Sequence, residues 1–290
     1  MPIDPKQASG QSLGVTEAAY GPRDVILYHL GLGAGAAATD AKELEYTYEG
    51  SLKVLPSFAV VAGQTNPQGG QDQRGFDDIP GLSFDLAMLL HGEEEIVLHQ
   101  PLPTKARIRT ETRIGDIYDK GKAALVIMEG DTQDASGAPL YSTRSSLFIR
   151  GEGGFGGEAG PEAGNTRPER APDGVVERAT LPQQALLYRL TGDMNPLHAD
   201  PAFAAKAGFE APIIHGLCSY GVACKAIVDE VLDGDVARVA GYSARFAGVF
   251  FPGETYEIAY WNEGDEIRLQ ATCKERQAPV LSNAAIRLRS

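Results

Sequence analysis

The stretch of sequence that decides the fold is LCSYGVACKAIVDEV, residues 217–231. Apolar residues recur along it at helical spacing, and Val222, Ala223 and Ala226 make the opposite side mostly apolar as well. A helix that is apolar on nearly every side must be surrounded by protein. The sequence therefore predicts a long central helix wrapped by other elements.

Strands follow this helix. Residues Thr255 to Trp261 and Ile267 to Cys273 predict two β-strands joined by a turn at Asn262–Asp265. The second strand alternates apolar and polar residues, which is typical of an antiparallel sheet with one face packed inward and one face in water. This pattern indicates an α+β unit whose sheet curls around the helix.

A second copy of this unit comes earlier in the chain. ILYHL at 26–30 matches LLYRL at 186–190 without a gap, and the strand rhythm of residues 101–150 matches that of residues 251–289. The chain has 290 residues, enough for about two domains. We expect an N-terminal unit at 1–150, a Gly- and Pro-rich linker at 151–174 and a C-terminal unit at 175–290.

One polar loop carries candidate chemistry. Asp193, Asn195 and His198 place a carboxylate, an amide and an imidazole within six residues. Pro196 fixes its own φ angle and moves Asn195 out of the α region, so we predict a tight extended loop. Such a loop can aim all three side chains into one cavity.

The first copy lacks these groups. Gly33, Gly35 and Ala38 stand where the second copy has its acid, amide and imidazole. We therefore expect the N-terminal unit to bind substrate and to lack catalytic residues. The Gly-rich segment 31–36 follows a helical pattern instead of a strand, which argues against a dinucleotide-binding loop.

Short helices flank the polar loop in the second copy. Thr180 and Pro182 predict the start of one helix, which Gly192 ends. Asp200 followed by Pro201 predicts an N-cap and first turn of another, which closes at Gly208.

Composition excludes several classes of protein. The net charge of -13, with no run of Lys or Arg, argues against a nucleic-acid surface. No apolar run reaches the roughly 18 residues of a membrane span, and residues 1–6 do not resemble a secretion signal. Cys218, Cys224 and Cys273 lack CxxC spacing and are predicted to be reduced core residues.

The motifs resemble those of one family. Residues 188–198, with Pro212–Gly216 behind them, resemble the signature of the MaoC-like dehydratases and the (R)-specific type 2 enoyl-CoA hydratases. The similarity extends over nearly the whole chain and includes residues 46–50, 55–56, 80–82, 90–93, 119–121 and 151–157. It implies a double hotdog: two repeats, each an antiparallel sheet curled around a central helix, with a shortened helix in the N-terminal repeat.

The resemblance also implies an activity in fatty acid metabolism such as β-oxidation. This activity is the reversible hydration of trans-2-enoyl-CoA to (3R)-3-hydroxyacyl-CoA. Hydration needs a base, an acid and a hydrogen-bond donor to the enolate oxygen, and it requires no metal or redox cofactor. CoA is part of the substrate and is not a cofactor here. Asp193 and His198 are expected to hold one water, with Asn195 orienting the water or the imidazole. The oxyanion donor is expected to be the amide of Gly216, at a helix N-terminus.

The predicted substrate contacts come from both units. By resemblance they are His91, Gly92, Lys120, Met194, Pro196, Leu197 and Phe246. Lys120 also makes sense as a cation for the anionic CoA on an acidic protein.

Several polar residues have plainer interpretations. Asp193 alone is compatible with a turn, and His198 alone with a structural histidine; only their joint spacing favours a site. His91 either caps a helix or contacts substrate, Lys120 either sits in a solvated hairpin or binds CoA, and His215 either packs at a helix start or contacts substrate. The remaining interpretations are structural: a core role for Tyr188, structural roles for His29 and His99, and a solvated face for Glu93–Glu95.

Two other functions fit the same fold class. A hotdog acyl-CoA thioesterase would direct water at the thioester carbonyl, and a silent acyl-CoA-binding protein would catalyse nothing. The C-terminal residues 287–290 lack a Ser-Lys-Leu address, so we expect a cytoplasmic protein. The resemblance further implies a homodimer with an acyl-CoA substrate and no nucleic-acid or membrane partner.

Overall fold

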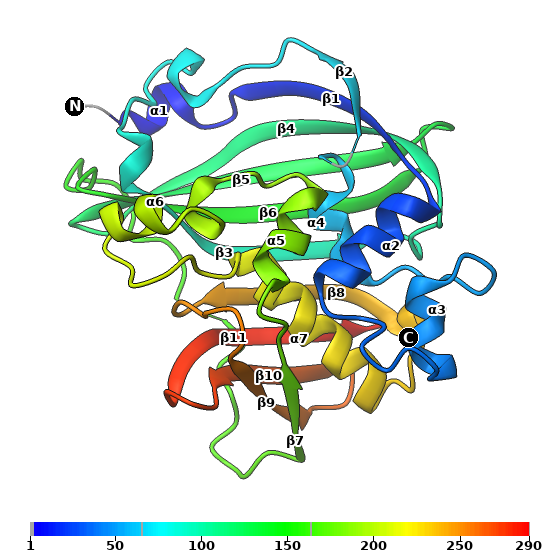
Figure 1. Cartoon of the computed structure of the whole chain (residues 1–290). Helices are drawn as coiled ribbons and strands as arrows, with labels where there is room; N and C mark the ends of the chain where they lie inside the picture. The colour runs from blue at the N-terminus through cyan, green and yellow to red at the C-terminus, as the bar shows by residue number, and fades with distance from the viewer. Residues whose placement is uncertain (1–2, 65, 163, 290) are drawn as a thin grey trace.

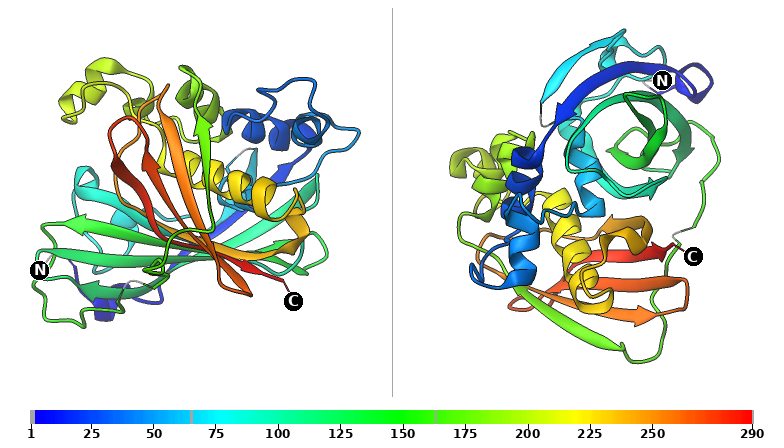
Figure 2. Two further views of the ribbon diagram at one scale, coloured as in Figure 1. Left: turned by 90° about the horizontal axis from the view of Figure 1, so that it is seen from below. Right: turned by 90° about the vertical axis from the view of Figure 1, so that its right-hand side faces the viewer.

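The computed structural model describes residues 3–64, 66–162 and 164–289. In these residues one antiparallel sheet of 11 strands runs through both halves of the molecule, in the order β2-β1-β4-β5-β6-β3-β8-β11-β10-β9-β7 (Figure 1). Figure 2 shows the tightly curled strands of the N-terminal half beside the strands of the C-terminal half.

The N-terminal half contains six strands and several short helices in the described residues. They are α1 (Pro5–Ala8), β1 (Ser12–Tyr20), α2 (Pro22–Gly31), α3 (Ala41–Thr47), α4 (Ala59–Ala62), β2 (Pro67–Gln71), β3 (Leu89–Leu98), β4 (Ala106–Asp119), β5 (Ala123–Asp134) and β6 (Pro139–Arg150). Three 3₁₀ turns accompany them, at Pro56–Phe58, Phe76–Asp78 and Leu86–Met88.

The C-terminal half repeats this plan around a longer helix. Its elements are β7 (Gly174–Ala179), α5 (Gln184–Tyr188), α6 (Pro201–Lys206), α7 (Gly216–Val231), β8 (Val239–Phe246), β9 (Thr255–Asn262), β10 (Glu266–Cys273) and β11 (Ala278–Leu288). Its 3₁₀ turns are Arg189–Thr191, Pro196–His198 and Val236–Arg238.

The strand order shows the duplication directly. Outward from the centre, one side reads β3, β6, β5, β4, β1 and the other reads β8, β11, β10, β9, β7; the first side has β2 as an additional strand at its edge. The two halves join where β3 pairs antiparallel with β8, from Glu93 opposite Arg245 to Val97 opposite Gly241. The predicted fold class, two repeats of an antiparallel sheet around a helix, is confirmed.

The central helix α7 is buried, as its sequence predicts. Its residues from Cys218 to Val228 are all buried, and the helix lies against β8 and β11 (Figure 1). The Tyr220 hydroxyl donates to the Tyr242 carbonyl at 2.8 Å, and Ser219 and Tyr256 share a hydrogen bond of 2.8 Å. Burial of each large apolar side chain contributes about 1.5–3 kcal/mol. None of the helices in the described ranges is long and apolar enough to cross a membrane.

The corresponding N-terminal helix is short, as expected. It consists of the 3₁₀ turn at Pro56–Phe58 and the single turn of α4. The two flanking helices of the repeats, α2 and α5, pack against each other. Gly31 of α2 lies where an added Cβ would come 3.1 Å from the Cα of Tyr188, so close packing there favours glycine.

Several local predictions hold and others need correction. Asp200 caps α6 by accepting the Ala202 amide hydrogen at 2.8 Å. The helix predicted up to Gly192 is α5 followed by a 3₁₀ turn, and Gly192 ends it with φ 135°. The polar loop is not extended throughout, because Pro196–His198 form a 3₁₀ turn directly after Asn195.

The plainer interpretations of most single residues are confirmed. Tyr188 is 1 % exposed, and all three cysteines are buried and free. His29 is fully buried; it accepts the Leu55 amide hydrogen at Nε2 and donates from Nδ1 to the Tyr46 carbonyl at 2.8 Å. His99 lies near the surface, within hydrogen-bond distance of Ser142.

Two interpretations in the N-terminal half need correction. His91 does not cap a helix, because it lies within β3. The solvated face expected at Glu93–Glu95 holds only in part: Glu93 and Glu95 are partly exposed and pair with Arg245 and Arg287, whereas Glu94 is only 3 % exposed. The pairing of β3 with strands on both sides, β6 and β8, explains why Glu94 can lie inside the molecule.

Candidate active site

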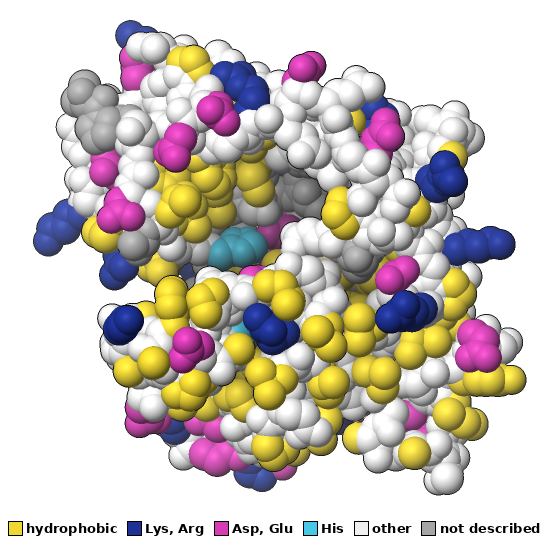
Figure 3. All heavy atoms as spheres, turned by 45° about the horizontal axis from the view of Figure 1, so that its top comes forward, with side chains coloured by type: hydrophobic (Ala, Val, Ile, Leu, Met, Phe, Trp, Pro, Cys, Tyr) yellow, Lys and Arg dark blue, Asp and Glu magenta, His cyan; other side chains and the backbone are white. Residues whose placement is uncertain are grey.

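A large cavity opens between the two halves. Its volume is about 1360 Å³. Figure 3 shows a hollow in the surface with hydrophobic side chains around it and a histidine at its edge. Apolar residues from the N-terminal strands, among them Leu125, Ile127 and Phe148, line part of the cavity, while Asp193 and His198 line it from the C-terminal half. Both repeats therefore contribute to one site.

The polar loop is held by its own backbone amides. The Asn195 amide donates to Oδ1 of Asp193 at 3.1 Å, and the Leu197 amide donates to Oδ1 of Asn195 at 3.0 Å. Oδ1 of Asn195 thus caps the 3₁₀ turn. The side-chain nitrogen Nδ2 of Asn195 is the group that remains for the predicted role of orienting the water or the imidazole. Asp193 is exposed to solvent at the cavity.

His198 is set up to accept a proton. Its Nδ1 lies 2.8 Å from the carbonyl oxygen of Ile213, which can only accept, so Nδ1 carries the hydrogen. Nε2 of the neutral ring is then a bare lone pair. Burial lowers the pKa of His198 from its usual value, so the ring is neutral near pH 7.

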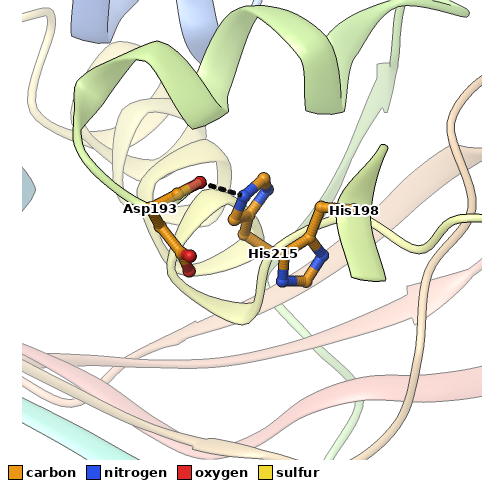
Figure 4. A group of neighbouring side chains, drawn as sticks. All are labelled: Asp193, His198 and His215. Carbon is orange, nitrogen blue, oxygen red and sulfur yellow. Dashed lines mark hydrogen bonds between the residues drawn. The ribbon is translucent and has the colours of Figure 1, made fainter. Parts of the chain in front are cut away.

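His215 supports both members of the pair (Figure 4). Its Nε2 donates to the backbone carbonyl of Asp193 at 3.2 Å, and its ring stacks on that of His198 with centroids 3.6 Å apart. Burial, and then the neighbouring His198, lower the pKa of His215 to about 4. His215 is 2 % exposed, and its Nδ1 has no hydrogen-bond partner among the described residues. It fixes the loop against the start of α7, which fits the packing alternative named above, and it also lines the cavity, so its contact with substrate stays a prediction.

The same three side chains offer metal-ligand atoms within 4.8 Å of one another. Their geometry does not fit a metal site. The two imidazole rings are stacked, at an interplanar angle of 25°, instead of radiating from a common point. His198 and His215 each donate one ring N–H to a backbone carbonyl, which metal ligands also do, so the stacking of the rings is the feature that argues against coordination. The arrangement fits proton transfer better than coordination.

A positive helix end faces this pair. Gly216 is the first residue of the 16-residue helix α7, and the first amides of a helix have no acceptor within it. A Cβ on Gly216 would lie 3.1 Å from the Phe246 ring, so the residue must be small. Phe246 in turn meets His91 edge-on, with ring centroids 4.8 Å apart.

The other predicted contacts divide into two groups. His91, Gly92, Lys120, Leu197, Gly216 and Phe246 line the cavity. Lys120 lies in the turn between β4 and β5, where its amide donates to the Ala123 carbonyl. Met194 and Pro196 are not among the lining residues, and Met194 is 54 % exposed.

Sequence reasoning missed further cavity residues. Glu94, Arg144 and Arg245 line the cavity, as do residues 159–162 and 164–165 of the linker. Asn165 of the linker donates to the Ser243 hydroxyl of β8 at 2.8 Å, which ties the linker to the cavity wall. Pairing of the strands brings these groups together, and no local motif signals it.

Two family models match the chain, one for each half. Residues 19–151 match the MFE-2 hydratase 2 N-terminal domain, and residues 163–284 match the MaoC like domain. The fold and the site thus define a MaoC-like double hotdog protein.

Similar proteins extend this result over the whole length. The chain is 47 % identical to Enoyl-CoA hydratase ChsH3 of Mycobacterium tuberculosis, over 99 % of this chain and 97 % of that protein. It is 40 % identical to the peroxisomal Enoyl-CoA hydratase 2 of Arabidopsis thaliana, over 92 % and 90 % of the two chains. The crystal structure of a MaoC-like dehydratase from Phytophthora capsici superposes with a TM-score of 0.87 at 32 % identity, covering 99 % of each chain. This protein belongs to the family of MaoC-like type 2 enoyl-CoA hydratases.

Proposed function

We propose that this enzyme adds water reversibly to trans-2-enoyl-CoA and forms (3R)-3-hydroxyacyl-CoA. The observation that carries the proposal is the pairing of the Asp193 carboxylate with the bare Nε2 of His198 in one cavity, beside the N-terminus of α7. Membership of the hydratase family supports the same reaction.

The acid–base pair handles both protons of the reaction. A water between Asp193 and His198 attacks C3 of the substrate, forming a C–O bond as one O–H bond breaks. The pair takes that proton and delivers one proton to C2, so water is added across the double bond without loss or gain of electrons. Addition of both groups from the face that carries the pair gives syn geometry. The two groups act as a unit, because closely coupled groups titrate together.

The start of α7 stabilises the charge that develops. Attack at C3 moves electrons onto the thioester oxygen, and the Gly216 amide is the donor for that oxygen. Loss of such a donor typically costs about 2.7–4 kcal/mol of transition-state stabilisation. Lys120, at the cavity, supplies a cation for the anionic CoA.

Turnover of trans-2-decenoyl-CoA tests the proposal. The enoyl-thioester absorbance should fall and the product should be the (R)-hydroxyacyl-CoA, with both effects lost in Asp193→Asn. Release of free thiol without loss of the double bond would instead establish a thioesterase. Binding without either reaction would establish a silent acyl-CoA-binding protein.

The homodimer and the cytoplasmic location belong to the same proposal. The three buried, free cysteines are compatible with a reducing compartment. Sedimentation of the purified protein at twice the mass of one 30.9 kDa chain would support the dimer, and a monomer would refute it.

A further inference from the structure

Glu94 is a buried carboxylate that the hydration chemistry does not use. It lines the cavity and is 3 % exposed. Its Oε2 accepts hydrogen bonds from Nε2 of His91 at 2.9 Å and from the Ser145 hydroxyl at 2.7 Å. Burial of a carboxylate is costly unless such partners satisfy it. Glu94 has two such partners, and one of them, His91, also lines the cavity, which suggests a role for Glu94 in the site.

The backbone of β3 is shaped to bring His91 and Glu94 together. Residues three apart in a regular strand point to opposite faces of the sheet. The register between β3 and β6 shifts between His91 and Glu93, which leaves Gly92 as an extra residue. This bulge turns both side chains to the same face. A Cβ on Gly92 would lie 3.2 Å from the Ser146 carbonyl oxygen, so the bulge favours glycine.

The hydrogen bonds fix the ring of His91. Its Nε2 lies 2.9 Å from Oε2 of Glu94 and 3.1 Å from the carbonyl oxygen of Glu93. A carbonyl oxygen can only accept, so Nε2 carries the hydrogen and donates it to both. The ring is thereby held edge-on to Phe246.

Phe246 carries this constraint to the other half of the molecule. Its ring lies against Gly216, at the first turn of α7. A chain of contacts thus runs from Glu94 in the N-terminal half, through His91 and Phe246, to the proposed oxyanion donor. It crosses the molecule where β3 pairs with β8.

We propose that Glu94 is a positioning residue for hydration: it holds His91 against Phe246 and so shapes the wall around the Gly216 amide. The inference rests on the proposed function. Glu94 acts through His91, so its removal should slow the reaction more than it weakens substrate binding.

Kinetics of two substitutions give the first test. Glu94→Ala should lower kcat for trans-2-decenoyl-CoA by about 10-fold and change KM by less than about 3-fold, because small misplacements at a reacting centre cost rate. Glu94→Gln keeps an acceptor oxygen for His91 and Ser145, so it should restore kcat to within about 3-fold of the wild type. Unchanged kcat in Glu94→Ala would overturn the proposal.

A double-mutant cycle separates positioning from general structural damage. If Glu94 acts through His91, then Glu94→Ala should have no further effect on kcat in a His91→Ala background. Equal effects of Glu94→Ala in the two backgrounds would contradict this route. Glu43→Ala is the matched control. Glu43 is a carboxylate bound to the buried Lys225 ammonium at 2.7 Å and is not among the cavity-lining residues, so its loss should lower stability and leave kcat unchanged.

Nuclear magnetic resonance gives a readout that needs no turnover. The chain has 5 histidines, so the ring signals can be assigned by substitution. The Nε2-bound proton of His91 should be protected from exchange in the wild type and in Glu94→Gln, and lost in Glu94→Ala. Protection that survives Glu94→Ala would overturn the anchoring of His91. An inactive wild-type enzyme would instead refute the proposed function.

Discussion

The loops at 33–38 and 193–198 correspond to each other in the two repeats, but they differ in what their polar groups contact. In the first, Gly33 and Gly35 have φ 88° and 80°, and the Gly35 amide donates to the carboxylate of Glu43 at 2.8 Å. In the second, Asp193 and His198 face the cavity. The first loop forms a hydrogen bond with a neighbouring helix residue, whereas the side chains of Asp193 and His198 in the second loop line the cavity. This contrast fits the prediction that the second repeat carries the chemistry and the first repeat does not.

The largest effect should come from loss of the chemistry in the second loop. Asp193→Asn and His198→Ala should each lower kcat by about 10²–10⁴-fold, because each removes one partner of the acid–base pair. Both folds should survive, with smaller changes in KM. Steady-state kinetics and circular dichroism check this. Near-normal turnover in either variant would rule out the pair.

Low pH should destabilise the fold by protonating two buried histidines, His29 and His215. Burial lowers the pKa of His29 to about 4, and His215 behaves alike, whereas an unfolded histidine titrates near 6.5. Neutral burial therefore stabilises the fold above pH 6.5, and this stability is lost as pH falls toward 4. Each site contributes up to about 3 kcal/mol over that window.

Denaturant unfolding of His29→Gln at several pH values measures this contribution. The variant should lose less stability than the wild type between pH 6.5 and pH 4, since glutamine does not titrate. Parallel curves for the two proteins would show that His29 is not the titrating group. Above pH 7 residue 29 should contribute no pH dependence to the free energy of unfolding in either protein.

A smaller effect is expected at the helix start behind the second loop. Gly216→Ala would place a Cβ 3.1 Å from Phe246 and push that ring away from the amide. The rate should fall by about 10-fold, since the donor remains but its surroundings shift. If kcat is unchanged, the close contact has no catalytic role. Gly221→Ala is the control, because it lies in the same helix but faces Leu32 and Tyr28. It should lower stability without a specific loss of kcat.

The smallest effect should come from the first loop. Gly35→Ala forces a Cβ into a left-handed conformation, at φ 80°, and against Thr47 at 3.2 Å. We expect a loss of about 1 kcal/mol in the free energy of unfolding and unchanged kcat. Thermal unfolding with parallel kinetics checks this. A fall in kcat at full stability would show that the first loop takes part in catalysis.

Local patterns made part of this structure predictable. The helix at 216–231 and the strands at 255–262 and 266–273 follow from periodicity, which only needs neighbouring residues. The Asp193–His198 grouping is visible because all its members lie in one loop. Its predicted catalytic roles, with those of Asn195 and Gly216, stay predictions until the variants are measured.

What could not be predicted depends on contacts between distant segments. Glu94 is predicted to be solvated because it lies in an acidic run, and its burial depends on the pairing of β3 with β6 and β8 and on the bulge at Gly92. The stack of His215 on His198 forms when the polar loop meets the start of α7. Arg144 and Arg245 reach the cavity from β6 and β8, whose positions are set by long-range pairing.

The pairing of β3 with β8 has a consequence for the separated repeats. Each of these strands is interior in the whole molecule and would become an open edge if the halves were parted at the linker. An unpaired edge invites association with other chains. Either repeat expressed alone should therefore aggregate or pair with a copy of itself, so the duplicated gene product has become a single unit of folding.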